Sequence, residues 1–230
     1  MKQYLAFLVF ILVASSCRKE SLQNASRQLQ VNNFTKVSVG GNFKVNVVKG
    51  AVFSVKVEGR TEDIDAINTV VREQELLIEY KNLQTLHELV TITVTMPSLN
   101  GFRFYNTAKA NVSGFQETST IGGTVSQYSN AVVHVSAPGL KVDVLDHAEL
   151  SLIGNTEQLE VRSDNQSVIH AFQMLSVYVR AIAVKNSLIR VHASNTIHAS
   201  ASKNSIIYFK GNPGNRFLAE LENSNIIEEW

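Results

Sequence analysis

The chain has 230 residues, of which 44% are hydrophobic, so it is too apolar for intrinsic disorder and long enough for one domain of about 200 residues. Its 21 Lys and Arg residues nearly balance 20 Asp and Glu residues, and the resulting net charge of +1 argues against a nucleic-acid partner. The single cysteine, Cys17, excludes an internal disulfide and a multi-cysteine metal site.

The first residues have the order of an export signal. Lys2 is followed by an apolar run over residues 5–14 and by two small serines directly before Cys17. Ten apolar residues span only about 15 Å as a helix, roughly half of a hydrocarbon core, which disfavours a transmembrane helix. The stretch over residues 12–17 resembles a bacterial lipoprotein signal, in which the cysteine receives a diacylglyceryl group and becomes the new N-terminus.

We therefore predict a signal peptide over residues 1–16 and lipid attachment at Cys17, which would make the membrane a partner through an N-terminal lipid carrying palmitate or a similar chain. An ordinary secretory signal with an incidental cysteine is the alternative. By the same resemblance, Arg18 after the cysteine favours the outer membrane. Residues 17–30 are polar without periodicity, and we expect a flexible tether there.

Residues 34–96 alternate as strands, interrupted by turn signals at Gly40-Gly41 and Lys49-Gly50. Residues 61–68 are compatible with a short helix, with Thr61 as its cap and Ile64 and Ile67 on one face, which would shield an end of the fold. No linker separates this region from the C-terminal part of the chain, so residues 31–230 are predicted to form a single domain.

The C-terminal part contains a repeat, with small residues as its anchors and apolar residues two and four positions further on. The anchors are Ala108, Ala131, Ala148, Ser167, Ser187 and Ser205. They lie about 17 to 23 residues apart, which is too close for strand-helix-strand crossovers and favours an all-β solenoid. Its lumen is expected to hold Val133, Leu150, Ile169, Ile189 and Ile207 in a single file.

A polar column precedes the anchors and is interpreted as a structural ladder of stacked amides at the corners. Its members are Thr107, Asn130, His147, Gln166, Asn186 and Asn204.

Several strand patterns resemble those of the head GIN domain family, labelled an autotransporter adhesin domain. They are Phe34-Thr35-Lys36-Val37-Ser38-Val39, Phe43-Lys44-Val45-Asn46-Val47, Val55-Lys56-Val57-Glu58-Gly59, Leu76-Leu77-Ile78 and Met96-Pro97-Ser98-Leu99. The resemblance covers roughly residues 31–225 and implies a right-handed parallel β-helix in an exported protein, often a lipoprotein. It carries no catalytic residues over to this chain.

The carboxylates and histidines are the candidate chemical groups. Asp143, Asp146 and Asp164 fall near equivalent corners with Arg162 close by, so a paired-carboxylate site of a polysaccharide lyase or hydrolase is geometrically feasible. A simpler explanation is that these Asp residues stand at corners and hydrogen-bond to the local backbone. The histidines lack metal-ligand spacing, and His134 and His170 are expected about 9.6 Å apart, two rung spacings. We predict no catalytic residue, metal or cofactor.

An outward column with an apolar stripe beside it is the candidate partner surface, and its key residues are His134, His170, Leu188, Arg190, Ile206 and Tyr208. Aromatic, guanidinium and apolar groups together can meet a glycan or an envelope protein. The favoured hypothesis is a lipid-anchored, non-enzymatic adhesin of the cell envelope. The alternatives are a carbohydrate-active β-helix enzyme and a structural envelope protein without a soluble ligand.

Overall fold

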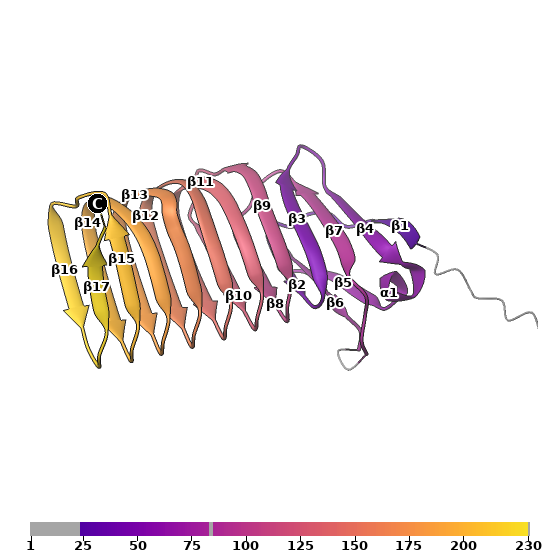
Figure 1. Cartoon of the computed structure of the whole chain (residues 1–230). Coiled ribbons are helices and arrows are strands. Elements are labelled where there is room, and N and C mark those ends of the chain that lie inside the picture. The colour runs from indigo at the N-terminus through magenta and orange to yellow at the C-terminus, as the bar shows by residue number, and fades with distance from the viewer. Residues whose placement is uncertain (1–23, 83–84, 230) are drawn as a thin grey trace, which may run out of the picture.

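The computed structural model describes residues 24–82 and 85–229. These residues form an elongated β-solenoid of about seven turns, with 70% strand and 2% helix, and its rungs are stacked along one axis (Figure 1). The prediction of an all-β solenoid is therefore confirmed.

The described strands pair into one continuous sheet, and a single short helix lies near its N-terminal end. In chain order the elements are β1 (Asn24–Leu29), β2 (Lys36–Gly40), β3 (Phe43–Lys49), β4 (Ser54–Arg60), α1 (Thr61–Asp65), β5 (Ile67–Arg72), β6 (Glu75–Tyr80), β7 (Val90–Met96), β8 (Gly101–Tyr105), β9 (Lys109–Gln116), β10 (Ile121–Ser126), β11 (Asn130–Leu145), β12 (Glu149–Asp164), β13 (Val168–Val184), β14 (Leu188–Ser202), β15 (Ile206–Lys210), β16 (Asn215–Glu220) and β17 (Asn225–Glu228).

The continuous sheet is wound into two faces, because each long strand bends midway from one face to the other. We call these faces the first sheet and the second sheet. The first half of β11 pairs with β9 and its second half with β10. The first sheet therefore contains β3, β7, β9, the first halves of β11 to β14, β15 and β17, and the second sheet contains β6, β2, β8, β10, the second halves and β16. At the bend of β12, Gly154 has φ +129°, and a Cβ there would lie 1.9 Å from the carbonyl oxygen of Val135.

The lumen is filled by files of apolar side chains, but one rung of the predicted file is displaced by two residues. Leu150, Ile169, Ile189 and Ile207 are register partners in successive rungs. The partner of Leu150 on the preceding rung is Ala131, whereas Val133 pairs with Leu152 in the neighbouring inward file. The single file containing Val133 was therefore wrong, and the true anchor of that rung is the buried Ser129.

From β8 onward, each corner that follows the second sheet contains two consecutive residues in the left-handed region, with φ between 51° and 72°. The pairs are Asn106–Thr107, Gln127–Tyr128, Asp146–His147, Asn165–Gln166, Lys185–Asn186, Lys203–Asn204 and Glu222–Asn223. Backbone bonds satisfy these corners: the Asn186 N–H donates to the Lys203 carbonyl of the next rung at 2.8 Å.

The predicted amide ladder is thus replaced by a backbone ladder, in which Tyr128 rather than Asn130 occupies the column. Tyr128 stacks on His147 of the next rung with ring centroids 4.9 Å apart. A side-chain hydrogen bond joins the residues directly before this column, where the Asn165 amide donates to the Asp146 carboxylate at 2.9 Å.

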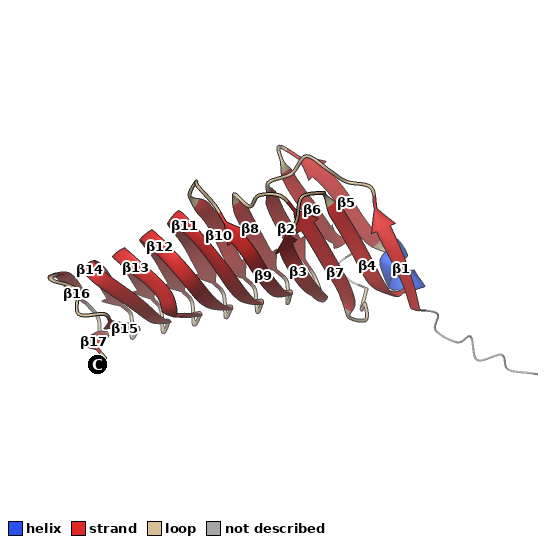
Figure 2. Ribbon diagram, turned by 90° about the horizontal axis from the view of Figure 1, so that it is seen from above, coloured by secondary structure: helices blue, strands red, loops and turns tan. Residues whose placement is uncertain are grey.

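The N-terminal rungs are not laid down in chain order. β2 lies between β6 and β8, and β3 lies between β7 and β9. Antiparallel pairs complete this end, since β4 joins β7 to β1, and β5 pairs with β6. Figure 2 shows α1 beside β1 at the end of the stack.

Two boundaries at this end differ from prediction. The expected tether over residues 17–30 includes β1, which pairs along its length with β4, so the residues from Asn24 belong to the folded body. The helix covers Thr61–Asp65 with Arg60 at its N-cap, not Thr61, and Ile67 already belongs to β5 because its strand pairs with β6. Ile64 is buried, as expected.

The C-terminal end closes with charged residues at lumen-facing positions. Arg216 occupies the file of Val179 and Ile197, and Glu228 that of Val191 and Phe209. The guanidinium donates to both carboxylate oxygens of Glu228, at 2.7 and 2.8 Å.

Candidate functional site

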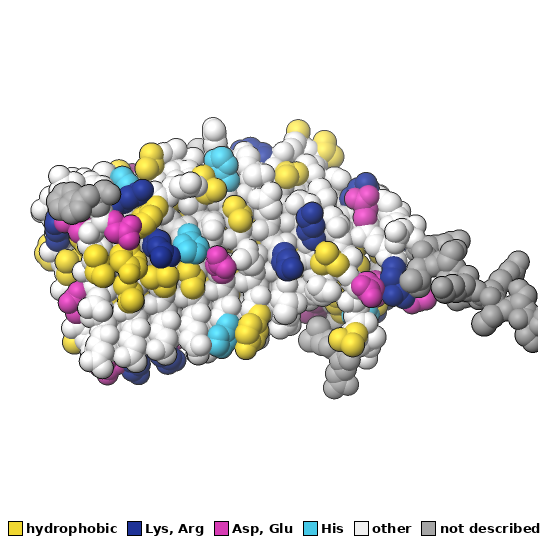
Figure 3. Space-filling model, viewed as in Figure 1, with side chains coloured by type: hydrophobic (Ala, Val, Ile, Leu, Met, Phe, Trp, Pro, Cys, Tyr) yellow, Lys and Arg dark blue, Asp and Glu magenta, His cyan; other side chains and the backbone are white. Residues whose placement is uncertain are grey.

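The predicted partner surface lies on the outward side of the first sheet. Two adjacent files carry it, one with Val168, Leu188 and Ile206 in register and the other with Ser151, His170, Arg190, Tyr208 and Ile227. We call these eight residues the partner face. Figure 3 shows hydrophobic side chains gathered here over the C-terminal rungs, with basic, acidic and His side chains beside them.

Five of the six predicted residues therefore come together, and His134 does not. His134 pairs with Ser113 and Ile153, one outward file away, whereas the neighbour of Ser151 is Val132. The cause is the same two-residue displacement of the β11 rung that moved Val133.

The polar groups of the partner face form a chain of contacts along the rungs. Arg190 Nη1 lies 3.3 Å from His170 Nδ1, and His170 Nε2 lies 3.3 Å from a Glu149 carboxylate oxygen. Because a guanidinium can only donate, Nδ1 accepts and Nε2 carries the hydrogen directed at Glu149. Arg190 Cζ also lies 5.4 Å from the centroid of the Tyr208 ring. The contacts hold Arg190 against the sheet with part of its surface accessible.

A shallow depression of about 290 Å³ adjoins these groups and is lined in part by His170, Phe172 and Arg190. The ammonium of Lys210 lies 4.7 Å from the centroid of the Phe172 ring. The partner face thus combines an apolar stripe with aromatic rings held beside cations.

The predicted acidic site at Asp143, Asp146 and Asp164 does not have the arrangement of a catalytic carboxylate pair. Asp164 is 8% exposed, and its carboxylate contacts Arg162 at 2.7 Å and Lys185 at 3.2 Å. Burial raises its pKa, but hydrogen bonds and the charges of Arg162 and Lys185 outweigh burial and lower the pKa below its ordinary value. Asp143 is the register partner of Arg162, and Asp146 accepts the bond from Asn165. A carboxyl held ionised in this way is unsuited to donate a proton near neutral pH.

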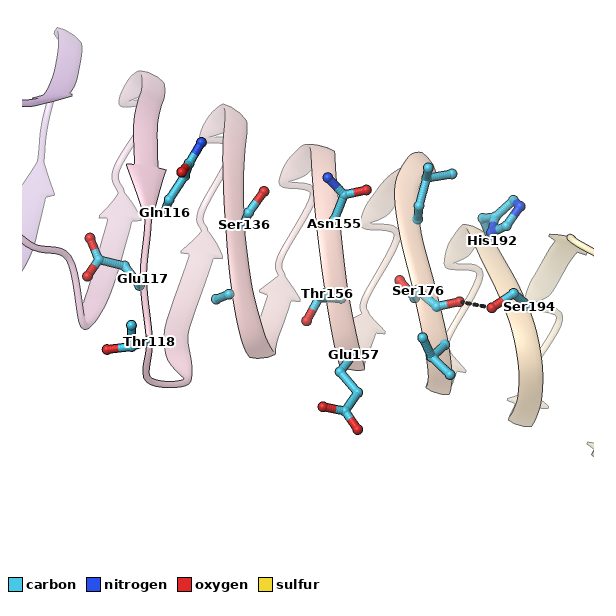
Figure 4. Close-up of a pocket in the computed structure, with 13 residues that line it drawn as sticks. Gln116, Glu117, Thr118, Ser136, Asn155, Thr156, Glu157, Ser176, His192 and Ser194 are labelled. Atoms are coloured by element: carbon cyan, nitrogen blue, oxygen red, sulfur yellow. Dashed lines mark hydrogen bonds between the residues drawn. The ribbon is translucent and has the colours of Figure 1, made fainter.

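A second concave surface follows the bends between the two sheets, and sequence reasoning missed it. It is a groove of about 870 Å³ across the end of β9 and the bends of β11 to β14. Its lining consists of Gln116, Glu117, Thr118, Ser136, Ala137, Asn155, Thr156, Glu157, Leu175, Ser176, Val177, His192 and Ser194 (Figure 4).

One outward file runs along this groove. Gln116, Ser136, Asn155, Leu175 and His192 are register partners in successive strands. Figure 4 shows the four polar members, Gln116, Ser136, Asn155 and His192, on strands that follow one another along the solenoid. Within the described part of the chain, the side chains of Gln116, Ser136 and Asn155 have no hydrogen-bond partner, and His192 Nδ1 is a buried atom without one. Burial, followed by the charge of Lys210, lowers the pKa of His192.

A protein-family model described as "Putative auto-transporter adhesin, head GIN domain" matches residues 33–213 of the chain. The chain belongs to the head GIN domain family. Among curated proteins none matches this head GIN domain protein.

Solved structures share the fold. A "putative adhesin" of Bacteroides fragilis has a TM-score of 0.83 at 18% identity, covering 91% of this head GIN domain chain and 98% of its own. A "putative lipid binding protein" of Parabacteroides distasonis has a TM-score of 0.67 at 13% identity, covering 90% and 97%. A "putative adhesin" of the same species has a TM-score of 0.64 at 18% identity, covering 91% and 98%. At these identities the likeness concerns the fold of the head GIN domain.

The lipid-attachment prediction at Cys17 falls outside the described residues. Among the residues that the structure does describe, no helix is both long and apolar enough to cross a membrane. Across these same ranges, no three His, Cys, Asp or Glu side chains are grouped as metal ligands would be.

Proposed function

We propose that this head GIN domain protein is exported, is anchored to the cell envelope through a lipid on Cys17, and acts as a non-enzymatic adhesin. The observation that carries the proposal is the partner face, where an apolar stripe and an ordered Arg190–Tyr208 contact occupy adjacent files of a rigid sheet. The family description and the lipoprotein-like leader support export and surface display.

The partner face suits a protein. Its half-buried aliphatic side chains lie flush with a sheet, and Tyr and Arg are the residue types that anchor protein interfaces. Ile227 is 41% exposed and extends the stripe toward the last rung. Aliphatic side chains offer few groups that could bond to sugar hydroxyls, so this face favours a protein over a glycan.

The anchor would hold the solenoid by its N-terminal end. β1 begins at Asn24, only seven residues beyond Cys17, and an extended chain covers at most about 3.6 Å per residue, or about 25 Å here. With lipid on Cys17, the β1 and α1 end is held near the bilayer, and the C-terminal rungs that carry the partner face extend away from it (Figure 1).

The enzymatic alternative has less support, because its best carboxylate is held ionised by two cations. A general acid of a glycosidase needs a raised pKa, which is the opposite shift.

The proposal predicts both anchoring and adhesion. Bacteria expressing the full chain should incorporate labelled palmitate into it, and should bind a surface coated with envelope proteins more strongly than cells without it. Cys17→Ser should abolish the labelling and release the protein from the membrane. Ile206→Glu should keep the labelling and reduce adhesion to background, because it places a charge in the apolar stripe.

A matched control is Val52→Glu, which makes the same kind of change at a residue that is 74% exposed in the β3–β4 connection. It should adhere like the wild type. Adhesion that survives Ile206→Glu, or that is equal in cells lacking the protein, would favour a structural envelope role. Release of reducing ends from a polysaccharide panel would favour an enzyme.

A further inference from the structure

We propose that the groove across the bends of β11 to β14 binds a linear, uncharged glycan chain lying parallel to the solenoid axis. This site is separate from the partner face, because its file leads from Gln116 to His192 and shares no residue with that surface. The proposal therefore stands independently of the protein partner proposed above.

The polar side chains of the groove are spaced like the units of a sugar chain. Gln116, Ser136 and Asn155 come from successive strands, so their side chains recur about every 4.8 Å along the groove. That period is close to the length of one pyranose unit in a linear chain. An extended peptide repeats its side chains on one face about every 6.6 Å and would drift out of phase with the file. The spacing favours a glycan over a peptide.

The groove lining offers both hydrogen-bond donors and hydrogen-bond acceptors. Gln116 and Asn155 each offer an amide donor and an acceptor, and Ser136 and Thr118 offer hydroxyl groups. Such groups can donate hydrogen bonds to sugar hydroxyls and can also accept hydrogen bonds from them. The buried hydroxyls deeper in the groove are already used: Thr156 donates to the Gln158 carbonyl and Ser176 to the Met174 carbonyl. Apart from the buried His192 Nδ1, the unpartnered groups named here, on Gln116, Ser136 and Asn155, are thus those at the groove surface.

Apolar groups lie between the polar ones. Ala137, Leu175 and Val177 line the groove, and Leu175 is 52% exposed. A pyranose ring presents C–H groups on its faces, and these can rest on Leu175 while the ring hydroxyls bond at its edges. The alternation of amide, hydroxyl and aliphatic groups therefore matches an amphipathic sugar ring.

The charges of the groove favour an uncharged ligand. The lining contains Glu117 and Glu157 but neither Lys nor Arg. The cations near the two ends are engaged: Lys49 lies 3.6 Å from Glu117, and Lys210 lies over Phe172. A polyanionic glycan would therefore meet the Glu157 carboxylate and find no free cation in the lining, which selects an uncharged chain.

The test measures binding by calorimetry with the full-length chain in a zwitterionic detergent that has no sugar headgroup. The probes are linear hexasaccharides of glucose, mannose, xylose and N-acetylglucosamine, with hexagalacturonate as the anionic comparison. At least one neutral hexasaccharide should bind, and hexagalacturonate should bind more weakly. Asn155→Ala should weaken binding about three- to tenfold, since it removes one bidentate-capable amide. Leu175→Asp should weaken it at least about tenfold.

Asn111→Ala is the matched control, because Asn111 is an exposed Asn on the first sheet outside the groove. It should bind like the wild type, and so should Ile206→Glu. Circular dichroism of each variant verifies that it is folded. The proposal is overturned if no neutral hexasaccharide binds, if hexagalacturonate binds equally well, or if folded Asn155→Ala and Leu175→Asp bind like the wild type.

Discussion

At the scale of single residues, Asp164 shows how the solenoid holds a largely buried charge at a corner. Its carboxylate is 12% exposed and lies between Arg162 and Lys185, both about half exposed. Nearby hydroxyls bond to backbone, with Ser167 donating to the Asp164 carbonyl at 2.8 Å. Asp164 is therefore a structural link between neighbouring rungs.

Asp164→Asn should lower the free energy of unfolding by about 1–3 kcal/mol at pH 7, because two cations lose their shared partner. The folded pKa of Asp164 lies below its unfolded value, so its stabilisation is present above the unfolded pKa, about 3.9, and is lost as the pH falls through the folded pKa. Urea unfolding of the chain lacking its leader, at pH 7 and near pH 2.5, measures both effects. The deficit of the variant should shrink at the lower pH.

Asp146→Asn is the control, since Asp146 is an exposed corner residue and its change should stay within about 0.5 kcal/mol. A deficit for Asp164→Asn that is the same at both pH values would contradict this account.

The sequence did place Asp164 near a corner, but it could not show that its partners are Arg162 and Lys185 rather than local backbone.

At the scale of elements, the corners are strained relative to ordinary turns. Each places two non-glycine residues in the left-handed region, where an L-residue costs roughly 1–2 kcal/mol, with Asn the most tolerant after Gly. The cost is offset by the bonds that each corner makes to the next, as between Asn204 N–H and Glu222 carbonyl at 3.0 Å. Lys203, with φ 56°, is a poor residue for this position.

Lys203→Asn should therefore raise the free energy of unfolding by about 0.5–1 kcal/mol. The same change at Lys109, the exposed first residue of β9, should be neutral or slightly destabilising, because Asn is disfavoured in strands. Urea midpoints with unchanged slopes measure both variants. A lower midpoint for Lys203→Asn than for the wild type would argue against strain at this corner.

The same elements explain how much of the fold was predictable. Period-two alternation identified which side chains face the lumen, because a strand has no other way to bury one face. A slip of two residues keeps every side chain on its face, so alternation could not distinguish Ser129 from Ala131 as an anchor. Val133 and His134 were displaced for this reason. The groove lies at bends where β13 shifts register between Ala171 and Leu175, and no repeat marks that irregularity.

At the scale of the whole molecule, the two ends of the stack are protected differently. α1 and β1 cover the N-terminal end, whereas β16 is exposed along its whole length, with Phe217 57% and Leu218 45% exposed. An open edge of this kind can pair with another chain unless something prevents it. The inward Arg216–Glu228 pair provides that protection, because charges at lumen positions disfavour stacking of a second apolar rung.

Replacing the pair with Arg216→Leu and Glu228→Leu together should convert the leaderless protein from monomers to end-to-end oligomers. Sedimentation velocity at increasing concentration measures the change. Lys141→Leu with Glu160→Leu is the matched control, since it removes a 3.3 Å ion pair from the outer surface, far from the open edge. A double Arg216/Glu228 variant that stays monomeric would show that the edge is blocked in another way.

The interleaved position of β2 and β3 has a consequence for how the protein acquires its shape after crossing a membrane. Lys36 of β2 pairs with both Glu75 and Gly101, so this rung gains its two neighbours only after much of the later chain has been delivered. From β10 onward each rung lies against the one that came just before it. During secretion from the N-terminus, the strands up to β9 would thus assemble together as a cooperative nucleus, and the later rungs would be added one at a time.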